Sequence, residues 1–514
     1  MDSKKLFAVA ILCLALLTGI FIVITEKVTA AATLIVDDNG ACPGATYFTI
    51  QSAVNAAAPG DTIQVCAGTY TETVTVNKTL TLLGAQNGVD ARTRAAAPGT
   101  ESVVNGAGGG FNITASNVVI NGFTIEGASG PGIKSDGGQV LYNIIRNNTL
   151  GLYIDDNGFQ NTIRFNLFDS NNGAGTNSGM GIYSDSGADA VIVDSNKFTG
   201  HNTASMSFDG GQIGANITNN QLVNDSSILL SLVTSPSITG NTITGSKSDA
   251  IRFINGIDGA RLSCNTITNS AGSALKIGDP LSVGGVSTNL QYKDNNIQGN
   301  LFGLKLDPGA YTTPGGRLDA TNNWWGSATG PNDLQGGNPG GTGDKIDDPD
   351  EVVDYVPFRT APILDTDGDS TLDSCDADDD NDGTPDATDL CSLDPGKVAP
   401  GACGCGVPDT DTDSDGTPDC LDQCPTDPNK IAPGACGCGI PDTDTDADGV
   451  PNCNDNCPTT PNTDQGDFDH DGIGDACDPP ENKDQCKNDE WQNFIFPRRF
   501  KNQGDCIQFV NTGK

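Results

Sequence analysis

A six-residue pattern recurs about nine times between residues 115 and 330, and it restricts the fold more than any other feature of the chain. Each copy has an apolar residue, Asn three positions later, and a second apolar residue two positions after the Asn. The copies are Val118/Asn121/Phe123, Val140/Asn143/Ile145, Ile163/Asn166/Phe168, Val193/Asn196/Phe198, Ile217/Asn220/Leu222, Ile238/Asn241/Ile243, Leu262/Asn265/Ile267, Tyr292/Asn295/Ile297 and Ala320/Asn323/Trp325. Recurrence every 21 to 30 residues is typical of a solenoid, in which one unit cannot bury its apolar face alone.

Apolar and polar residues alternate around each copy, and no helical period is sustained, so we expect short strands joined by turns. Asn tolerates the left-handed backbone of tight turns. Stacked from coil to coil, the Asn side chains could form an internal hydrogen-bonded ladder, with the apolar residues filling the bore. The pattern predicts an all-β chain whose main part is a right-handed parallel β-helix.

Two stretches also resemble a known family. "TIQSAVNAAAPGDTIQVCAGTYTETVTVNKTLTLLGA" is similar to the first coil of pectin-lyase-like β-helix proteins, with residues 49–58 as the amphipathic helix that caps the open end. "NNWWGSATGP" (322–331) resembles the closing motif of many secreted bacterial β-helix proteins. The resemblance covers about residues 33–360. It implies the fold but no activity, because lyases, hydrolases, esterases, adhesins and inert surface proteins share it.

A second pattern lies upstream of each Asn, as in "IKSD" (133–136), "LYID" (152–155) and "IYSD" (182–185). Its second and fourth positions should face outward together and stack about 4.8 Å apart. They predict a candidate carbohydrate groove of Lys134, Asp136, Tyr153, Asp155, Tyr183, Asp185, Asp209, Arg252, Lys276 and Lys305. Aromatic rings beside charged groups suit sugar binding. The alternative is turn chemistry, since Gly follows Asp136 and Asp209.

The same groove would also permit a polysaccharide lyase, with the carboxylates holding Ca²⁺ and Arg252 or Lys276 acting as the base. The Gly-His-Gly and Arg-x-Lys motifs of polygalacturonases are missing, as are the paired Asp segments and the Gly-Arg-Pro-Trp stretch of pectin methylesterases. His201, the one His of the coil region, is expected in an exposed loop. We therefore predict no catalytic residue.

After residue 362, five segments fit one frame with acidic residues at positions 1, 3, 5, 9 and 12. They are Asp365, Asp367, Asp369, Asp373 and Asp376; Asp378, Asp380, Asp382, Asp386 and Asp389; Asp411, Asp413, Asp415, Asp419 and Asp422; Asp444, Asp446, Asp448, Asn452 and Asp455; and Asp467, Asp469, Asp471, Asp475 and Asp478. Ca²⁺ takes six to eight oxygens, which carboxylates on alternate residues of a curved loop supply, and Gly at position 6 of the last four segments permits a sharp turn. An EF-hand or a dockerin is excluded, because Pro, Gly and Cys flank every segment and position 12 is not Glu. A disordered acidic tail would explain neither the frame nor the cysteines.

The cysteines of this region recur every 33 residues, as Cys391/Cys424/Cys457 and Cys403/Cys436 do. The region resembles thrombospondin type 3 repeats, with an added "APGACGCG" that the usual pattern lacks. The resemblance implies disulfides between successive loops wrapped around a row of Ca²⁺ ions. It also implies that the acidic residues of the frame are the ligands and that Asn452 weakens the fourth site by one charge. Which of these cysteines pair is left open.

The N-terminus has Lys4 and Lys5, an apolar run over residues 6–24 and small residues near 28–30, which predict a secretory signal peptide. An uncleaved membrane anchor is the alternative. An exported chain can form disulfides, and we expect the pairs Cys42–Cys66 and Cys486–Cys506. Cys264 is expected to be a buried thiol.

We divide the chain into residues 1–30 as signal peptide, 31–330 as β-helix, 331–363 as closing segment and linker, 364–480 as calcium-binding repeats and 481–514 as a disulfide-closed C-terminal element. Thirty Asp and two Lys over residues 365–478 exclude nucleic-acid binding. The sequence predicts a secreted or surface-displayed protein that binds Ca²⁺ and an extracellular polysaccharide or cell-surface glycan without turnover. A lyase and a purely structural spacer are the alternatives.

Overall fold

The computed structural model describes residues 31–97, 99–155, 159–185, 190–211, 213–279, 285–313, 316–369 and 371–514. It has two compact units, the first ending at Asp376 and the second spanning Ala377–Lys514. The predicted signal peptide lies outside the described residues. Within the described residues, no helix has the length and apolar character needed to cross a membrane.

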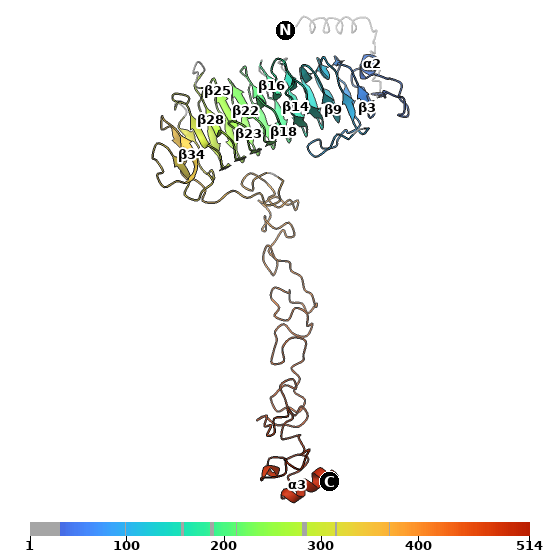
Figure 1. Cartoon of the computed structure of the whole chain (residues 1–514), viewed down its shortest axis with the longest axis vertical. Helices are drawn as coiled ribbons and strands as arrows, with labels where there is room; N and C mark the ends of the chain where they lie inside the picture. Colours follow the sequence, from blue (N-terminus) through green and yellow to red (C-terminus); the bar gives the residue numbers. More distant parts are fainter. Residues whose placement is uncertain are drawn as a thin grey trace, which may run out of the picture. The chain divides into compact units, whose positions relative to one another are not determined.

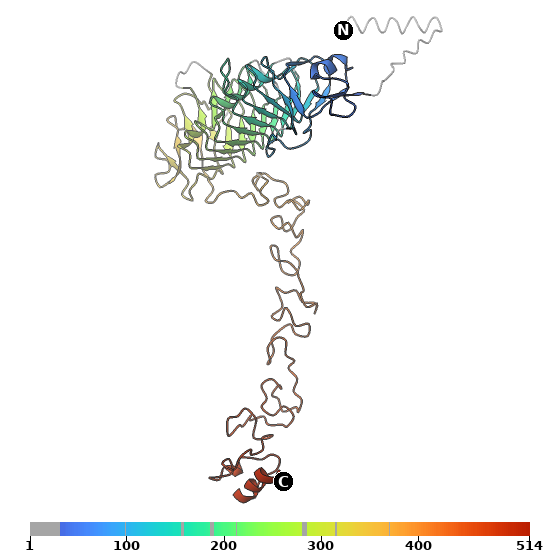
Figure 2. The same cartoon turned by 45° about the vertical axis from the view of Figure 1, so that its right-hand side comes forward.

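Three parallel sheets make up the first unit (Figures 1 and 2). Sheet A consists of β1 (Thr33–Val36), β2 (Thr62–Val65), β5 (Thr81–Leu83), β8 (Val118–Asn121), β11 (Gly138–Leu141), β14 (Asn161–Arg164), β17 (Ile192–Asp194), β20 (Asn216–Thr218), β23 (Ser237–Thr239), β26 (Arg261–Ser263), β29 (Gln291–Lys293), β32 (Leu318–Asp319) and β35 (Val353–Asp354). Sheet B consists of β3 (Gly68–Tyr70), β6 (Ser102–Val104), β9 (Phe123–Glu126), β12 (Ile144–Arg146), β15 (Leu167–Asp169), β18 (Lys197–Thr199), β21 (Gln221–Val223), β24 (Thr242–Thr244), β27 (Thr266–Thr268) and β30 (Asn296–Gln298). Sheet C consists of β4 (Val74–Val76), β7 (Phe111–Ile113), β10 (Pro131–Ser135), β13 (Leu150–Ile154), β16 (Met180–Ser184), β19 (Ala204–Phe208), β22 (Ser227–Ser231), β25 (Ile251–Ile254), β28 (Ser273–Ile277), β31 (Phe302–Leu306), β34 (Gly343–Asp347) and β33 (Pro331–Asp333).

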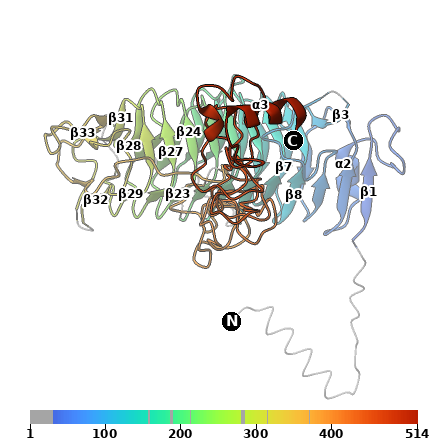
Figure 3. The same ribbon diagram turned by 90° about the horizontal axis from the view of Figure 1, so that it is seen from below.

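Most coils contribute one strand to each sheet, and neighbouring coils pair in parallel, so the expected all-β parallel solenoid is confirmed. The helix α2 (Ile50–Ala56) lies beside β1 at one end of the solenoid (Figure 3) and packs on β1, β2 and β4 through Ile50, Ala53 and Val54. The paired strands β33, β34 and β35 lie in residues 331–354, within the stretch expected to close the helix and lead into a linker.

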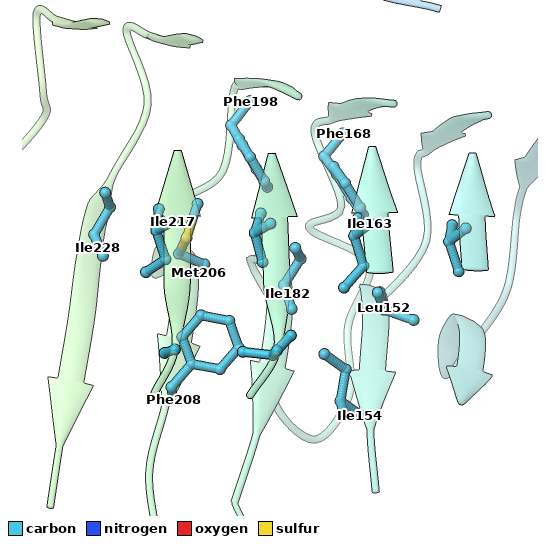
Figure 4. Packing of buried hydrophobic residues seen from close by; sticks show 14 of the residues in the cluster. Leu152, Ile154, Ile163, Phe168, Ile182, Phe198, Met206, Phe208, Ile217 and Ile228 are labelled. Atoms are coloured by element: carbon cyan, nitrogen blue, oxygen red, sulfur yellow. The ribbon is translucent and has the colours of Figure 1, made fainter. Parts of the chain in front are cut away.

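Apolar side chains stack from coil to coil inside the solenoid (Figure 4). Val140 pairs with Ile120 on one side and with Ile163 on the other, and all three are almost completely buried. Phe168 and Phe198 stack with ring centroids 4.8 Å apart. Each such residue stabilises the fold by about 1.5–3 kcal/mol through burial, so the repeated apolar positions account for the stability of the solenoid core.

The expected Asn ladder is present in eight coils. Each ladder Asn is buried, and its Oδ1 accepts hydrogen bonds from the backbone N–H and the Nδ2 of the Asn in the preceding coil, as between Asn166 and Asn196 at 3.0 and 2.9 Å. The ladder consists of Asn143, Asn166, Asn196, Asn220, Asn241, Asn265, Asn295 and Asn323. Asn121 was wrongly assigned to it. The strand register pairs Asn121 with Leu141, and the backbone N–H of Phe123 makes the first ladder contact, to Asn143.

The left-handed backbone conformation belongs to the residue before each ladder Asn and not to the Asn itself, contrary to expectation. Tyr142, Phe165, Ser195 and Cys264 have φ between 56° and 61°. This position turns the chain from sheet A to sheet B, while the Asn side chain satisfies backbone groups that the turn leaves buried. The ladder therefore depends on hydrogen bonding and not on the backbone freedom of Asn.

A second ladder, which the sequence patterns did not identify, follows sheet B. Its members stand five residues after those of the first ladder, as Asn148, Asn171, His201 and Asp225 do. The residue before each member again has a left-handed backbone, for example Asn147 and Ser170. The signal in the sequence was a polar residue at this fixed offset.

The second unit contains little regular structure. Its described elements are a short 3-10 helix (Glu490–Gln492) and α3 (Gln503–Thr512), and the rest consists of turns. The apolar cluster of this unit surrounds the Cys486–Cys506 disulfide and includes Phe494 and Phe500. The turns between residues 377 and 480 therefore depend on something other than an apolar core.

Candidate functional site

The outward face of sheet C aligns the residues predicted to form the carbohydrate groove. Strand pairing stacks Lys134, Tyr153, Tyr183, Ser207, Leu229, Arg252, Lys276 and Lys305 in one row. Leu229, which the sequence analysis did not include, divides the row into two parts with different chemistry.

The part before Leu229 combines tyrosines with carboxylates. Lys134 Nζ lies 2.8 Å from Asp155 Oδ2, and Tyr153 donates a 2.8 Å hydrogen bond to Asp185 Oδ1. The rings of Tyr153 and Tyr183 are 6.0 Å apart. The hydrogen bond to Asp155 raises the pKa of Lys134, whereas partial burial and the charges of Asp185 and Asp209 raise the pKa of Tyr183. Lys134 therefore stays charged and Tyr183 stays neutral at ordinary pH.

Two carboxylates of this groove also stand at turns. Gly137 and Gly210 follow Asp136 and Asp209 with φ of 149° and 98°, a backbone that residues with side chains rarely adopt. Burial raises the pKa of Asp136, and one of its oxygens has no hydrogen-bond partner among the described residues. Turn geometry and an outward carboxylate thus occur at the same positions.

The part after Leu229 is basic. Lys276 lies 3.4 Å from Asp307, and Lys305 lies 3.3 Å from Asp347 and over the ring of Phe302. Arg252 Nε is buried without a hydrogen-bond partner in the described part of the chain. Both lysines already pair with carboxylates, so neither is arranged as an available base.

His201 is fully buried, and the expectation of an exposed loop residue was wrong. Its Nδ1 lies 2.8 Å from Asp225 Oδ2, and its Nε2 lies 3.1 Å from Asn171 Nδ2. Since Nδ2 of Asn171 can only donate, Nε2 of His201 accepts and its Nδ1 carries the proton that is donated to Asp225. His201 is a member of the second ladder, and it lies inside the solenoid.

The five acidic segments form five loops, numbered 1 to 5: residues 365–376, 378–389, 411–422, 444–455 and 467–478. In each loop, carboxylate oxygens from positions 1, 3 and 5 lie within 4.8 Å of one another. The backbone is left-handed at the Gly of position 6 in loops 2 to 5, with φ of 94° to 98°. Position 6 of loop 1, Ser370, lies outside the described residues. Position 4 has a left-handed backbone in all five loops, with φ of 57° to 78°.

Positions 3 and 12 fit a cation best. In loops 2, 3 and 4 each of these carboxylates has one buried oxygen without a hydrogen-bond partner among the described residues, as at Asp380 and Asp389. At position 12, Asp389, Asp422 and Asp455 are only 7–9% exposed, and their other oxygen accepts the backbone N–H of the cysteine two residues later at 2.6–2.8 Å. Buried carboxylate oxygens without donors are unfavourable unless a cation lies among them.

The electrostatics of the loops agree with this fit. Burial, followed by repulsion from neighbouring carboxylates, raises the pKa of Asp380, Asp413 and Asp446 at position 3. The same causes raise the pKa of Asp478, at position 12 of loop 5, to about 6. The loops are thus destabilised by their own charge, which a bound cation would neutralise.

Position 9 closes each loop. Its side chain accepts the backbone N–H of position 2, as Asp419 does from Thr412 at 2.8 Å, and its own N–H bonds to the carbonyl that precedes the loop. Asn452 keeps both contacts in loop 4, where its Oδ1 accepts the N–H of Thr445 and its Nδ2 donates to Thr445 Oγ1. An amide therefore serves this role as well as a carboxylate.

The added "APGACGCG" stretches link the loops through disulfides. In the first insert, Cys405 bonds to Cys391, which follows loop 2, and Cys403 bonds to Cys420 of loop 3. The next insert repeats this arrangement with Cys424–Cys438 and Cys436–Cys453, and Cys457–Cys477 joins the end of loop 4 to loop 5. Pairing left open by the sequence is thus supplied by the structure.

A lysine two residues before each insert binds carbonyl groups of that insert. Lys430 Nζ donates to the carbonyls of Pro433 and Gly437 at 3.1 and 2.9 Å and lies 2.9 Å from Asp442. Lys397 makes the corresponding contacts in the first insert. The two lysines of the acidic region are therefore its internal counter-charges.

Cys264 is buried, but it forms a disulfide with Cys375 of loop 1, so the expectation of a free thiol was wrong. Its left-handed backbone, φ 61°, places it in the series of corner residues and interrupts strand alternation. Residues around 357–376 contact the same corners, because Arg359 pairs with Asp294 and Ile363 exchanges two 2.8 Å hydrogen bonds with Asn296. Loop 1 is thus part of the first unit.

The structure also contains the Cys42–Cys66 and Cys486–Cys506 disulfides. In the C-terminal element, Arg498 pairs with Asp505 at 2.7 Å and lies over the ring of Phe500. This hydrogen bond lowers the pKa of Asp505 to about 2. The element is a small disulfide-closed fold with its own apolar cluster.

Comparison with known proteins identifies the repeats. Residues 364–396, 402–431 and 435–465 match the thrombospondin type 3 repeat, so these stretches are repeats of that kind. A comparison with curated proteins found no match.

Several solved structures are similar to the solenoid. An alginate lyase from Paenibacillus sp. str. FPU-7 is 16% identical over 55% of this chain and 97% of its own, with a TM-score of 0.37. A mannuronic acid specific family 6 polysaccharide lyase from human gut microbiota is 16% identical over 57% and 79%, with a TM-score of 0.40. PfbA, a surface adhesin of Streptococcus pneumoniae, is 15% identical over 50% and 82%, with a TM-score of 0.31. Likenesses at this level carry no argument about activity.

Proposed function

We propose that the chain is an extracellular calcium-binding protein whose repeat loops hold Ca²⁺ and whose solenoid recognises a carbohydrate. The observation that supports calcium binding most directly is the set of buried carboxylate oxygens without donors at positions 3 and 12 of loops 2, 3 and 4, among the described residues. Eight disulfides in the described part of the chain support an extracellular location.

In this proposal positions 1, 3, 5 and 12 of each loop bind Ca²⁺ and position 9 closes the loop. Bound Ca²⁺ supplies the positive charge that lets these carboxylates lie together. Backbone N–H groups already orient the ligands, since in loop 3 Ser414 and Gly416 donate to Asp411 and Thr417 donates to Asp415. We do not expect a weaker fourth site, because Asn452 replaces a closing residue and not a ligand.

The test is a calcium titration of the full chain, combined with limited proteolysis in Ca²⁺ and in excess EGTA. We expect saturable binding at millimolar Ca²⁺ or below, and cleavage in EGTA between residues 377 and 480, while the solenoid resists the protease in both. The solenoid acts as the internal control. Equal protease resistance with and without Ca²⁺, or no saturable binding, would refute the proposal.

Carbohydrate recognition is supported by the row of Tyr153, Tyr183 and their charged neighbours on sheet C. Half-exposed rings can stack on sugars, and the carboxylates and Lys134 can bond to hydroxyls or uronates. We expect binding to at least one polysaccharide on a glycan array and loss of at least ten-fold in affinity for Tyr153→Ala and Tyr183→Ala, about 1.4 kcal/mol. Phe48→Ala is the control, because Phe48 is an exposed aromatic outside sheet C.

The same samples separate the alternatives. A polysaccharide lyase would produce ultraviolet absorbance from unsaturated products when pectin or alginate is added. A structural spacer would bind no glycan. We favour recognition without turnover, because one candidate base, Lys276, is held in an ion pair with Asp307 and the Nε of the other, Arg252, is buried.

A further inference from the structure

The disulfides enclose the calcium loops in a consistent way. In loops 3 and 4 the cysteine at position 10, Cys420 or Cys453, bonds backwards in the sequence to an insert. In loops 1 and 5 the cysteine at position 11, Cys375 or Cys477, bonds backwards to Cys264 or Cys457. Each bridge therefore closes a covalent ring around positions 1 to 9 of its loop and leaves position 12 just outside.

Loop 2 is the exception. Ala387 and Thr388 occupy its positions 10 and 11, and the whole loop lies between Cys375 and Cys391, outside every ring. Loop 2 fits a cation as well as its neighbours do, because Asp380 and Asp389 both have a buried oxygen without a hydrogen-bond partner among the described residues. Loops 2, 3 and 4 thus share the same buried carboxylate oxygens, and loop 2 differs from the other two in its covalent connection.

Tension between the solenoid and the C-terminal element follows the shortest covalent path. That path crosses from Cys264 to Cys375, runs along the backbone to Cys391, and crosses to Cys405. From Cys405 the path runs back along the backbone over one glycine to Cys403 and crosses the disulfide to Cys420. The second insert repeats these steps with Cys424–Cys438 and Cys436–Cys453, and the path then reaches Cys477 through its disulfide with Cys457. Apart from the short segments between Cys403 and Cys405 and between Cys436 and Cys438, the backbone of every ring is bypassed and bears no load.

The lengths of the two paths differ strongly. Fully extended, the backbone from Cys264 to Cys477 would measure about 700 Å, whereas the path through the bridges measures about 130 Å. The unbridged segment from Cys375 to Cys391, which contains loop 2, accounts for about 55 Å of the shorter path. Most of the extension that remains available therefore lies in one calcium loop.

We propose that the chain is a load-bearing tether, in which disulfides divert tension around calcium loops 1, 3, 4 and 5 and leave loop 2 as the one loop that tension opens. General stabilisation of a module without an apolar core would explain the number of bridges, but any pairing would serve it. It does not explain why, in four of the five loops, a bridge ends between the closing residue and the last ligand. The calcium dependence of loop 2 rests on the proposed function, whereas the bypass rests on the bridges alone.

Single-molecule force spectroscopy of the oxidised full chain, held at its two ends, tests the proposal. In Ca²⁺ the event at lowest force should lengthen the chain by no more than about 55 Å, and EGTA should lower its force. The double variant Asp380→Asn/Asp389→Asn in loop 2 should lower it in the same way. The matched variant Asp446→Asn/Asp455→Asn in loop 4 should leave the trace of the oxidised chain unchanged.

A bridge variant tests the bypass separately. Cys403→Ser/Cys420→Ser opens the ring around loop 3, so it should add one calcium-dependent event of about 40 Å. An unchanged trace for this variant, an effect of the loop 4 variant on the oxidised chain, or gains of several hundred ångströms before reduction at forces that leave the solenoid folded would each overturn the proposal. If all lengths are as expected but Ca²⁺ and EGTA give identical forces, the bypass stands and calcium binding by loop 2 is refuted.

Discussion

The Asn ladder predicts a large loss of stability when one member is truncated. Asn196 is fully buried, and its Nδ2 donates to the carbonyl of Ile163 at 2.8 Å, while its Oδ1 accepts the backbone N–H of Asn166 at 3.0 Å. Asn196→Ala leaves both backbone groups buried without a partner. An unsatisfied buried polar group costs about 1–3 kcal/mol, so the substitution should lower the free energy of unfolding by about 3–5 kcal/mol.

Denaturant unfolding of the full chain, followed by circular dichroism of the strands, measures this loss. The matched control is Asn216→Ala, because Asn216 lies at an outward, half-exposed position of β20 in the next coil. Surface substitutions of this kind usually change stability by about 0.5 kcal/mol or less. If Asn196→Ala costs less than about 1 kcal/mol, or no more than the control, the ladder does not hold the coils together and the argument from buried hydrogen bonds fails.

Three further predictions concern the second ladder, the loop ligands and the inserts. His201→Leu removes the donor to the buried carboxylate of Asp225 and should cost about 3–5 kcal/mol in denaturant unfolding, whereas His201→Asn, which keeps a donor, should cost clearly less. Asp422→Asn should remove one Ca²⁺ site from a calorimetric titration, whereas Asp419→Asn, at the closing position, should preserve the number of sites; equal effects would contradict the separation of ligand and closing roles. Lys430→Met should expose residues 432–439 to protease even in saturating Ca²⁺, because three oxygen acceptors lose their shared cation, and unchanged digestion would show that the disulfides suffice.

The solenoid and the repeat frame could be predicted from the sequence because both depend on a short period. Strand alternation and the recurring Asn fix one coil, and the acidic positions fix one loop, without knowledge of distant contacts. The predicted alignment of the coils was wrong where a coil departs from the repeating pattern. Asn121 matches the pattern by spacing alone, and the pairing of Asn121 with Leu141 shifts it by two residues.

Corners were harder to predict than strands. A left-handed residue before each ladder Asn interrupts the alternation of side chains, and this turned Cys264 towards Cys375 instead of into the bore. Cys375 is 111 residues away, and no local pattern indicates such a contact. His201 was misassigned for a related reason, because its neighbours in the ladder are Asn171 and Asp225 in other coils.

The loop positions show what spacing cannot separate. Asp residues at positions 9 and 12 look alike in the sequence, yet one closes the loop through the backbone and the other has an oxygen without a donor among the described residues, as Asp419 and Asp422 show. Asn452 indicates the difference in the sequence, because position 9 tolerates an amide in an otherwise acidic frame. On the proposed function, a ligand set derived from charge alone includes one residue too many in each loop.

The two units are stabilised by different forces, and this determines how each should respond to its surroundings. The solenoid buries apolar side chains and amide ladders, which Ca²⁺ does not affect. Between residues 377 and 480, cysteines are the main buried apolar side chains, so order there depends on the disulfides, on two lysines and, on the proposed function, on Ca²⁺ among the carboxylates. Removal of Ca²⁺ should loosen the second unit within limits set by the disulfides, and reduction should remove those limits. A solenoid that stays folded while residues 377–480 extend under load needs its own source of stability, because unfolding of one part of a shared core would unfold the other part.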